Sequence, residues 1–315
     1  MPVTLDPDAA TVYKLYQDAG RPPYETVTPQ QARELYLKGC LAASPPPPDL
    51  ASISDFAIRA PHRTIPARLY MPKQRRDKAG LAPALVFFHG GGWVIGNLDT
   101  HDVACRKLAH AGEMTVIAVD YRLAPEHKFP AAVEDAVTAT QWVASNAAGL
   151  GIDPSRLVIG GDSAGGNLAA VVALSAREAD GPALAGQLLV YPATDFAMRH
   201  ASHRELETSV LLTHSVIRWF RDHYLNDLAD GDDWRASPAR AKHFAGLPPA
   251  YVLTAGADPL RDEGAEYAER LQDAGVAVTY RHFPGQFHGF FTMGKFLEQS
   301  NVAIGEIGAW LRALG

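Results

Sequence analysis

The sequence predicts an α/β fold in which helices flank both faces of a mostly parallel central sheet. Short, almost continuously apolar segments recur along the chain, a pattern typical of strands that are buried on both faces. Segments with helical periodicity separate most of them, and such alternation is typical of layered α/β domains. The chain has 315 residues, of which 47% are hydrophobic, so it can bury a large core.

The N-terminal part predicts two helices followed by a strand pair. Residues 11–19 and 29–41 show mixed helical patterns. The four prolines at 45–48 cannot continue a helix, so we expect an extended connector there. Residues 53–60 and 64–70 alternate between apolar and polar side chains, which predicts an antiparallel pair with one buried face.

The rest of the chain predicts the parallel part of the sheet. Its expected strands are residues 84–88, 115–119, 157–159, 188–191, 251–254 and 276–280. Its expected helices are residues 103–111, 131–147, 165–178 and 264–274. The helix at 165–178 is apolar almost all round, so we expect it to lie deep against the sheet. Residues 199–235 are polar, histidine-rich and helical, and interrupt the alternation as an insertion.

Charge and composition disfavour several classes of protein. With 29 Lys and Arg against 35 Asp and Glu, no basic stripe exists for phosphates, and we expect no nucleic-acid partner. No apolar run approaches the roughly 18–20 residues that cross a bilayer, so we expect no integral membrane association. The first residues lack a basic stretch followed by an apolar core, which favours a cytoplasmic location. Cys40 and Cys105 are expected to be reduced, partly buried thiols, with a single disulfide as the alternative.

Residues 161–165 read Gly-Asp-Ser-Ala-Gly and stand between an expected strand and the buried helix. A serine on such a tight strand-to-helix turn is a candidate nucleophile, and the flanking glycines avoid a collision of side chains. We therefore predict Ser163 as a catalytic nucleophile. The alternative is a glycine-rich turn that binds nothing or holds a phosphate, but the sequence has no P-loop motif.

Residues 89–93 read His-Gly-Gly-Gly-Trp and directly follow the expected strand 84–88. Three successive glycines leave backbone N–H groups uncovered, and such donors can hold the oxyanion of a tetrahedral intermediate. A flexible loop is the alternative interpretation. For His89 itself we expect a scaffold role, in which a hydrogen bond fixes the loop.

A serine nucleophile needs a base, and the base needs a carboxylate that orients it. His288 lies in a turn-rich loop after the expected strand 276–280, and Asp258 follows the expected strand 251–254. Both therefore stand past the carboxyl ends of parallel strands, where α/β sheets place their sites. We predict His288 as the base and Asp258 as its partner.

Other titratable residues are weaker candidates. His282 lies closer to the body of its strand, so we expect a structural role. Asp262 and Glu263 fall where a helix begins, and acidic side chains are normal at that position. The histidines of the insertion are expected at the surface: His200, His203, His214 and His223.

Together, these motifs resemble the hormone-sensitive-lipase-like branch of the α/β-hydrolases, the bacterial family IV carboxylesterases with a GDSAG motif. The matching segments are HGGGW at 89–93, YRLAPEHKFPAA at 121–132, GDSAGG at 161–166, DPLRDEG at 258–264 and HGF at 288–290. The chain order Ser, Asp, His is also that of the α/β-hydrolases and differs from the two protease orders. The resemblance implies an α/β-hydrolase domain over residues 51–315, with a helical cap built from residues 1–50 and the insertion at 199–235.

The resemblance also implies a site and an activity. The implied site consists of the nucleophile Ser163, the base His288, the carboxylate Asp258, and an oxyanion hole from the N–H groups of Gly91, Gly92 and Ala164. The implied activity is the hydrolysis of short- to medium-chain carboxylic esters through an acyl-enzyme, with a small-molecule ester as substrate and no metal or cofactor. Many members dimerise through the last strand and a neighbouring helix, which implies a homodimer.

Some assignments keep an alternative. Trp93, Leu211 and Leu212 are predicted to line the substrate pocket, although ordinary packing in the cap would equally explain the two leucines. Residues 121–132 are predicted to form a buried polar network that holds loops near the site. The alternative function is a non-catalytic protein that binds a small molecule on the same fold, as in some plant hormone receptors. Those receptors lack a working catalytic histidine, whereas His288 is present here.

Overall fold

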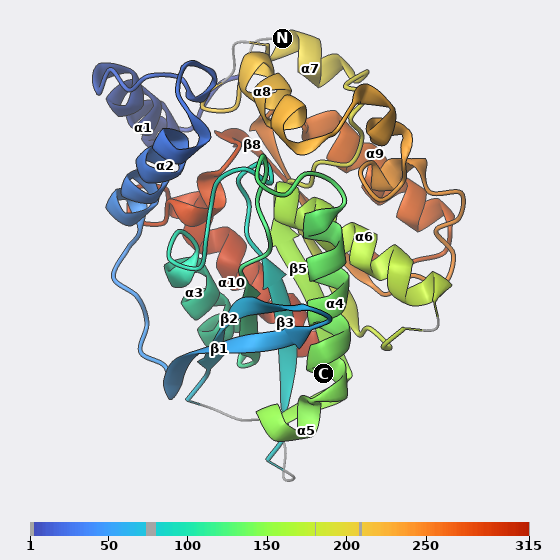
Figure 1. Ribbon diagram of the computed structural model, residues 1–315. Coiled ribbons are helices and arrows are strands. Elements are labelled where there is room, and N and C mark those ends of the chain that lie inside the picture. Colours follow the sequence, from blue (N-terminus) through green and yellow to red (C-terminus); the bar gives the residue numbers. More distant parts are fainter. Residues whose placement is uncertain (1–2, 74–79, 180, 208–209, 315) are drawn as a thin grey trace.

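A single mixed sheet of eight strands organises the part of the chain that the computed structural model describes, residues 3–73, 80–179, 181–207 and 210–314 (Figure 1). The strands are β1 (Ser52–Ala60), β2 (Arg63–Met71), β3 (Ala82–Phe88), β4 (Thr115–Val119), β5 (Ile152–Asp162), β6 (Gly186–Val190), β7 (Ala250–Ala257) and β8 (Val278–Phe287). Their order is β1-β2-β4-β3-β5-β6-β7-β8. The β1–β2 and β2–β4 pairs are antiparallel and all other pairs are parallel. The predicted fold class is therefore confirmed.

Helices cover both faces of this sheet and one of its ends. The α-helices are α1 (Pro7–Asp18), α2 (Pro29–Ala43), α3 (Asp102–Gly112), α4 (Ala131–Ser145), α5 (Ala147–Leu150), α6 (Ala164–Glu178), α7 (Ala201–Glu205), α8 (His214–Tyr224), α9 (Arg261–Asp273) and α10 (Glu298–Ala313). Short 3-10 helices are η1 (Tyr24–Thr26), η2 (Leu228–Asp232), η3 (Pro238–Arg240) and η4 (Phe290–Thr292). The sequence patterns did not indicate α10.

Strand β3 shows how the centre of the sheet is buried from both sides, since all seven of its residues are buried. Successive side chains of a strand point to opposite faces. Leu85 and Phe87 belong to a cluster with α3 and α10, whereas Val86 and Phe88 belong to another with α4, α6 and α9. A strand between two apolar layers has no polar face, which explains its continuous apolar sequence.

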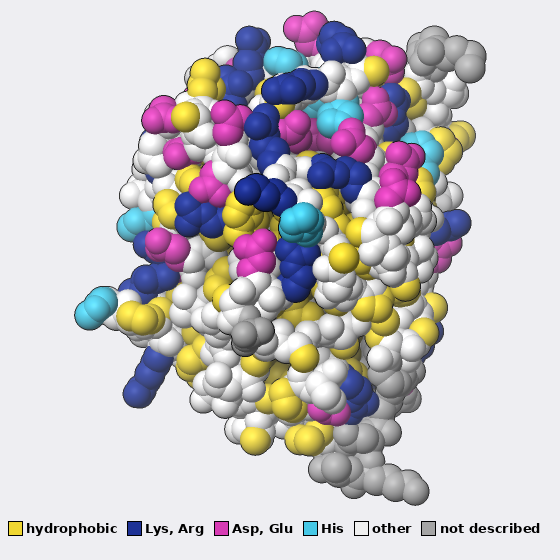
Figure 2. Space-filling model, turned by 90° about the vertical axis from the view of Figure 1, so that its right-hand side faces the viewer, with side chains coloured by type: hydrophobic (Ala, Val, Ile, Leu, Met, Phe, Trp, Pro, Cys, Tyr) yellow, Lys and Arg dark blue, Asp and Glu magenta, His cyan; other side chains and the backbone are white. Residues whose placement is uncertain are grey.

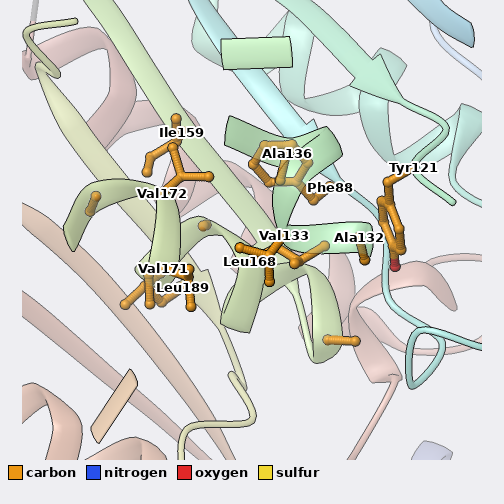
Figure 3. Packing of buried hydrophobic residues seen from close by; sticks show 14 of the residues in the cluster. Phe88, Tyr121, Ala132, Val133, Ala136, Ile159, Leu168, Val171, Val172 and Leu189 are labelled. Carbon is orange, nitrogen blue, oxygen red and sulfur yellow. The ribbon is translucent and has the colours of Figure 1, made fainter. Parts of the chain in front are cut away.

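Helix α6 is buried along most of its length, as its sequence predicted. Leu168, Val171 and Val172 of this helix belong to one cluster with Ile159 of β5 and Leu189 of β6 (Figure 3). Full burial of each such side chain stabilises the fold by about 1.5–3 kcal/mol. Because α6 begins directly after Ser163, this packing also fixes the turn that carries the serine.

The predicted cap segments lie at one end of the molecule. Figure 1 shows α1, α2, α7 and α8 gathered there, and residues 44–50 connect α2 to the sheet without helix or strand, as expected.

On the face in Figure 2, basic and acidic side chains are interspersed rather than segregated by sign. Within the described residues, no helix has the length and apolar character needed to cross a membrane. Cys40 and Cys105 are free thiols, as expected, and both are buried.

Candidate active site

Ser163 occupies the sharp turn between β5 and α6. Its φ of 57° and ψ of −117° are rarely adopted by residues other than glycine. The turn is held by the Ser163 N–H, which donates to the carbonyl of Val190 at 2.8 Å. A Cβ at Gly161 or Gly165 would overlap backbone atoms, including the carbonyl oxygen of Phe88. The sequence therefore needs glycine on both sides of this serine, for the steric reason predicted.

His288 follows β8 directly and faces Ser163. Its Nε2 lies 2.8 Å from Ser163 Oγ, and its Nδ1 lies 2.7 Å from Asp258 Oδ2. Asp258 is fully buried, and its Oδ1 accepts the N–H of Leu260 at 2.9 Å. With Nδ1–H donated to the carboxylate, Nε2 is free to accept the serine proton. The structure thus brings together the three residues predicted for the triad.

The rival candidates lie elsewhere. His282 is exposed on β8, and its Nδ1 lies 2.9 Å from Thr254 Oγ1 rather than near Ser163. Asp262 and Glu263 stand in the first turn of α9, as expected. Strand β8 extends to Phe287, well beyond the predicted end at residue 280, so His288 follows the strand at once instead of lying in a long loop.

One histidine prediction was wrong, because His203 is buried and not at the surface. Its Nε2 lies 2.7 Å from Glu263 Oε2, and each of these two side chains is 1% exposed. Glu263 also accepts the backbone N–H of Thr194 at 2.6 Å. A buried imidazole is tolerated here because Glu263 supplies an ionisable hydrogen-bond partner. The remaining insertion histidines are partly exposed: His200, His214 and His223.

The glycine loop after β3 borders the same cavity as Ser163. Gly91 and Gly92 have φ values of 122° and 56°, and both line the cavity together with Ala164. Among the residues that the structure describes, the N–H groups of these three residues have no hydrogen-bond partner. Backbone N–H groups next to a nucleophile and without a protein acceptor can stabilise an oxyanion.

Asp162 is a residue of this site whose role the sequence analysis missed. Its Oδ1 accepts the N–H of Gly90 at 2.9 Å and lies 3.1 Å from Nε2 of His101. Burial opposes ionisation of this carboxyl, but His101 and the Gly90 N–H outweigh it and lower the pKa of Asp162. The only available signal was its position beside Ser163 in the GDSAG motif.

His89 has the scaffold role expected of it. Its Nδ1 lies 2.8 Å from the carbonyl oxygen of Gly90, and its ring stacks on Tyr121 with 4.4 Å between centroids. The Tyr121 hydroxyl donates to the His89 carbonyl at 2.7 Å. Burial lowers the pKa of His89 to about 3, so the ring is neutral at pH 7.

The polar network of residues 121–132 holds loops near the site but is less buried than predicted. Arg122 pairs with Asp135 at 2.9 Å, and Glu126 pairs with Arg33 of α2 at 2.6 Å. Glu126 is 55% exposed, and His127 is also exposed. The carboxylate of Glu126 and the imidazole of His127 are therefore solvated rather than buried.

A cavity of about 340 Å³ lies over Ser163 and His288. The predicted pocket residues Trp93, Leu211 and Leu212 all line it. Side chains from the N-terminal helices and from the insertion complete the walls, and they include Tyr16, Tyr36, Cys40, Val216, Ile217 and Phe220. Trp93 is held in place by the Tyr224 ring, which stacks on it with 4.4 Å between centroids.

Comparison with known proteins agrees with this geometry. Residues 85–292, more than half of the chain, match the model of a family described as having an alpha/beta hydrolase fold. The chain belongs to this family. The hydrolase is 42% identical to the carboxylic ester hydrolase LipN of Mycobacterium tuberculosis, over 90% of this chain and 76% of that protein. It is 38% identical to the ethyl acetate hydrolase of Pseudomonas putida, over 96% of each chain.

Solved structures give the same assignment. The hydrolase superposes on the ester-hydrolase EH1AB1 from the metagenome of Lake Arreo with a TM-score of 0.95 and 42% identity, covering 98% of this chain and 99% of that one. An esterase from Pyrobaculum calidifontis matches with a TM-score of 0.88 and 37% identity, covering 98% and 99% of the two chains. The resemblance to hormone-sensitive-lipase-like carboxylesterases is confirmed, and the protein is an ester hydrolase rather than a binding protein on the same fold.

Proposed function

We propose that this hydrolase is a serine carboxylesterase that cleaves short- to medium-chain esters, with Ser163 as nucleophile, His288 as base and Asp258 as its orienting carboxylate. The observation that carries the proposal is the pair of hydrogen bonds that joins the three side chains, 2.8 Å and 2.7 Å long. A serine hydroxyl on a strained turn is a weak nucleophile until such a base accepts its proton.

The proposed reaction proceeds in two halves. His288 Nε2 takes the Ser163 proton while Oγ attacks the ester carbonyl carbon, and the resulting imidazolium then protonates the departing alcohol. Water enters, gives a proton to the same histidine and attacks the acyl carbonyl, after which Ser163 Oγ leaves and recovers its proton. Asp258 keeps Nδ1 protonated throughout. The N–H groups of Gly91, Gly92 and Ala164 would hold both oxyanions, and one such donor is typically worth ~2.7–4 kcal/mol of barrier.

The cavity supports a modest, uncharged acyl group. Its volume of about 340 Å³ lies near the lower end of the roughly 300–1,000 Å³ typical of small-molecule sites. Aromatic and aliphatic side chains form most of its walls, so the favourable contribution from the acyl chain is apolar burial. One relative is named for a small ester, ethyl acetate.

We also propose that residues 1–50 and 199–235 form a cap over the domain of residues 51–315. Both segments line the cavity, and they are tied together by the Ser215 hydroxyl, which donates to Glu25 Oε1 at 2.6 Å.

A homodimer and a cytoplasmic location remain predictions. Strand β8 ends the described sheet, so its outer edge offers a surface for pairing, and sedimentation equilibrium checks the mass in solution.

The test of the function is the initial rate of p-nitrophenyl butyrate hydrolysis by the wild type and by Ser163→Ala. We expect turnover by the wild type and background rates from the variant. Equal activity of the two proteins would remove Ser163 from the mechanism. If both are folded but inactive, a series of p-nitrophenyl esters from acetate to decanoate separates a wrong acyl length from an absent activity.

A further inference from the structure

Asp6, in the N-terminal segment, contacts the chain just before His288. The Asp6 N–H donates to the carbonyl of Gly285 at 2.9 Å, and Asp6 Oδ2 accepts from Gln286 Nε2 at 2.9 Å. Gln286 is fully buried and stands two residues before His288. Two hydrogen bonds therefore join the beginning of the chain to the segment that carries the proposed base, across 280 residues of sequence.

The side chain of Asp6 takes part in this contact and does not cap its own helix. Asp6 stands at the N-cap position of α1, where an aspartate commonly accepts N–H groups of the first turn. Its side chain makes no such capping bond. Instead, the carboxylate lies so close to Gly285 that a Cβ there would overlap Asp6 Oδ1. Because residue 285 is a glycine, the Asp6 carboxylate can lie directly against the backbone that precedes His288.

The segment that Asp6 contacts lacks regular strand pairing. Ala255 of β7 pairs with Phe283 of β8, but Ala257 pairs with Phe287, so β8 uses four residues where β7 uses two. The extra residues bulge out of the ladder, and bulged residues are left unpaired within the sheet. Their position must therefore be fixed by contacts from outside the pairing.

Two close contacts hold this bulge in place. The first contact is between the Pro284 carbonyl and Gly256 of β7, which stands two residues before Asp258. The carbonyl oxygen occupies the place that a Cβ of Gly256 would take. The second contact is that of the Asp6 carboxylate with Gly285. His288 follows the bulge and must reach Asp258 and Ser163 at once, so a shift of the bulge would move the imidazole relative to both.

We propose that Asp6 is a positioning residue for His288, acting through the bulge at Gly285 and Gln286. This inference rests on the proposed role of His288 as the base. Asp6 does not line the cavity, so it acts on the geometry of the triad and not on binding of the ester.

The decisive comparison uses three variants of the N-terminal segment. Asp6→Ala removes the acceptor for Gln286, whereas Asp6→Asn keeps an oxygen that can accept the same N–H. Asp8→Ala is the matched control, because Asp8 anchors the same segment to the N–H of Glu298 at 3.0 Å and does not contact the bulge. Misplacement of a reacting group by about 1 Å can cost about 10²-fold in rate.

On p-nitrophenyl butyrate, we expect Asp6→Ala to lower kcat by about 10- to 100-fold with KM nearly unchanged. We expect Asp6→Asn and Asp8→Ala to stay within about twofold of the wild type. A loss in Asp8→Ala as large as that in Asp6→Ala would assign the effect to general anchoring and overturn the proposal. Wild-type kcat in Asp6→Ala would overturn it as well.

A second readout does not depend on turnover. The proton that His288 Nδ1 shares with Asp258 gives a downfield ¹H NMR resonance, which should broaden or disappear in Asp6→Ala and persist in the other two variants. An inactive wild type would refute the proposed function, while this resonance would still test the role of Asp6. If Asp6→Ala does not fold, Gln286→Met removes the donor from the other side and should cause the same loss; a normal resonance and kcat in Gln286→Met would refute the proposal.

Discussion

The Asp162 carboxylate accepts the N–H of Gly90 at 2.9 Å, and this hydrogen bond joins the turn of Ser163 to the glycine loop. The two segments follow different strands, β5 and β3, which are neighbours in the sheet. The distance between the proposed nucleophile and the proposed oxyanion donors is therefore set by a side chain as well as by strand pairing. The contact is close, since a Cβ at Gly90 would overlap the carboxylate.

Replacing Asp162 should damage both stability and activity. Asp162→Ala leaves the buried Gly90 N–H with only its long, 3.4 Å contact to His101 Nε2, and takes the carboxylate from His101. Each buried polar group left unsatisfied costs about 1–3 kcal/mol. We expect the free energy of unfolding in urea to fall by about that amount, with a lower kcat. Asp162→Asn keeps an oxygen acceptor for Gly90 and should lose less of both. Unchanged unfolding and kcat in Asp162→Ala would show that the sheet alone holds the loop.

Burial of neutral His89 should make the fold sensitive to acid. The folded pKa is lowered to about 3 from 6.5, so between these values the unfolded chain binds a proton that the native state does not. Stability attributable to His89 is therefore present above pH 6.5 and falls as the pH decreases toward 3. We expect this residue alone to reduce the free energy of unfolding by about 2 kcal/mol between pH 7 and pH 5.

Urea unfolding at pH 7 and pH 5 checks this expectation against His89→Asn, whose amide can still donate to the Gly90 carbonyl. The variant should show a smaller decrease between the two pH values than the wild type. An equal decrease in both proteins would mean that other groups cause the acid sensitivity.

A methyl group at Gly92 should abolish most of the activity. The φ of 56° is strained for any L side chain, and the added Cβ would overlap the Phe220 ring. Displacing this loop removes a proposed oxyanion donor, so we expect Gly92→Ala to lower kcat by about 10²–10³-fold. The double variant Gly92→Ala/Phe220→Ala removes the overlap but keeps the backbone strain. Full recovery of kcat in the double variant would show that the clash alone matters.

Enlarging the cavity at Leu212 should shift the preference toward longer acyl chains. Leu212 is 8% exposed and lines the cavity, so Leu212→Ala frees space for the substrate. Each methylene that gains burial contributes about 0.8 kcal/mol, and we expect the ratio of kcat/KM for hexanoate over butyrate esters to rise several-fold. Leu228→Ala is the control, since Leu228 is 69% exposed and lies outside the cavity walls. Equal ratios in both variants would place the acyl chain elsewhere.

The sequence predicted the fold and the meeting of Ser163, Asp258 and His288 because both depend on local patterns. Buried parallel strands are continuous apolar segments, and polar residues past their carboxyl ends are brought to one edge of the sheet. Other features depend on partners distant in sequence. The burial of His203 requires Glu263, 60 residues away, and nothing in the polar sequence of the insertion indicates that partner.

The end of β8 was mispredicted for a related reason. From Val278 to Arg281 the strand is partly or fully exposed at the edge of the sheet, and its buried part begins only with Phe283 and the bulge. Apolar continuity therefore stops early, while backbone pairing with β7 continues. The contact of Asp6 with this bulge is equally invisible in the sequence, because the two segments are 280 residues apart and no local pattern links them.

Helices α1, α2 and α8 each contribute apolar side chains to the walls of the cavity, whereas Ser163 and His288 come from the turns that follow β5 and β8. The proposed reacting groups and these wall positions therefore lie on different parts of the polypeptide. A library that varies only the inward-facing positions of these three helices would explore new substrates while sparing the reacting groups. The exception is the few residues ahead of α1, which should be kept constant in any such exchange because Asp6 reaches the segment of the proposed base.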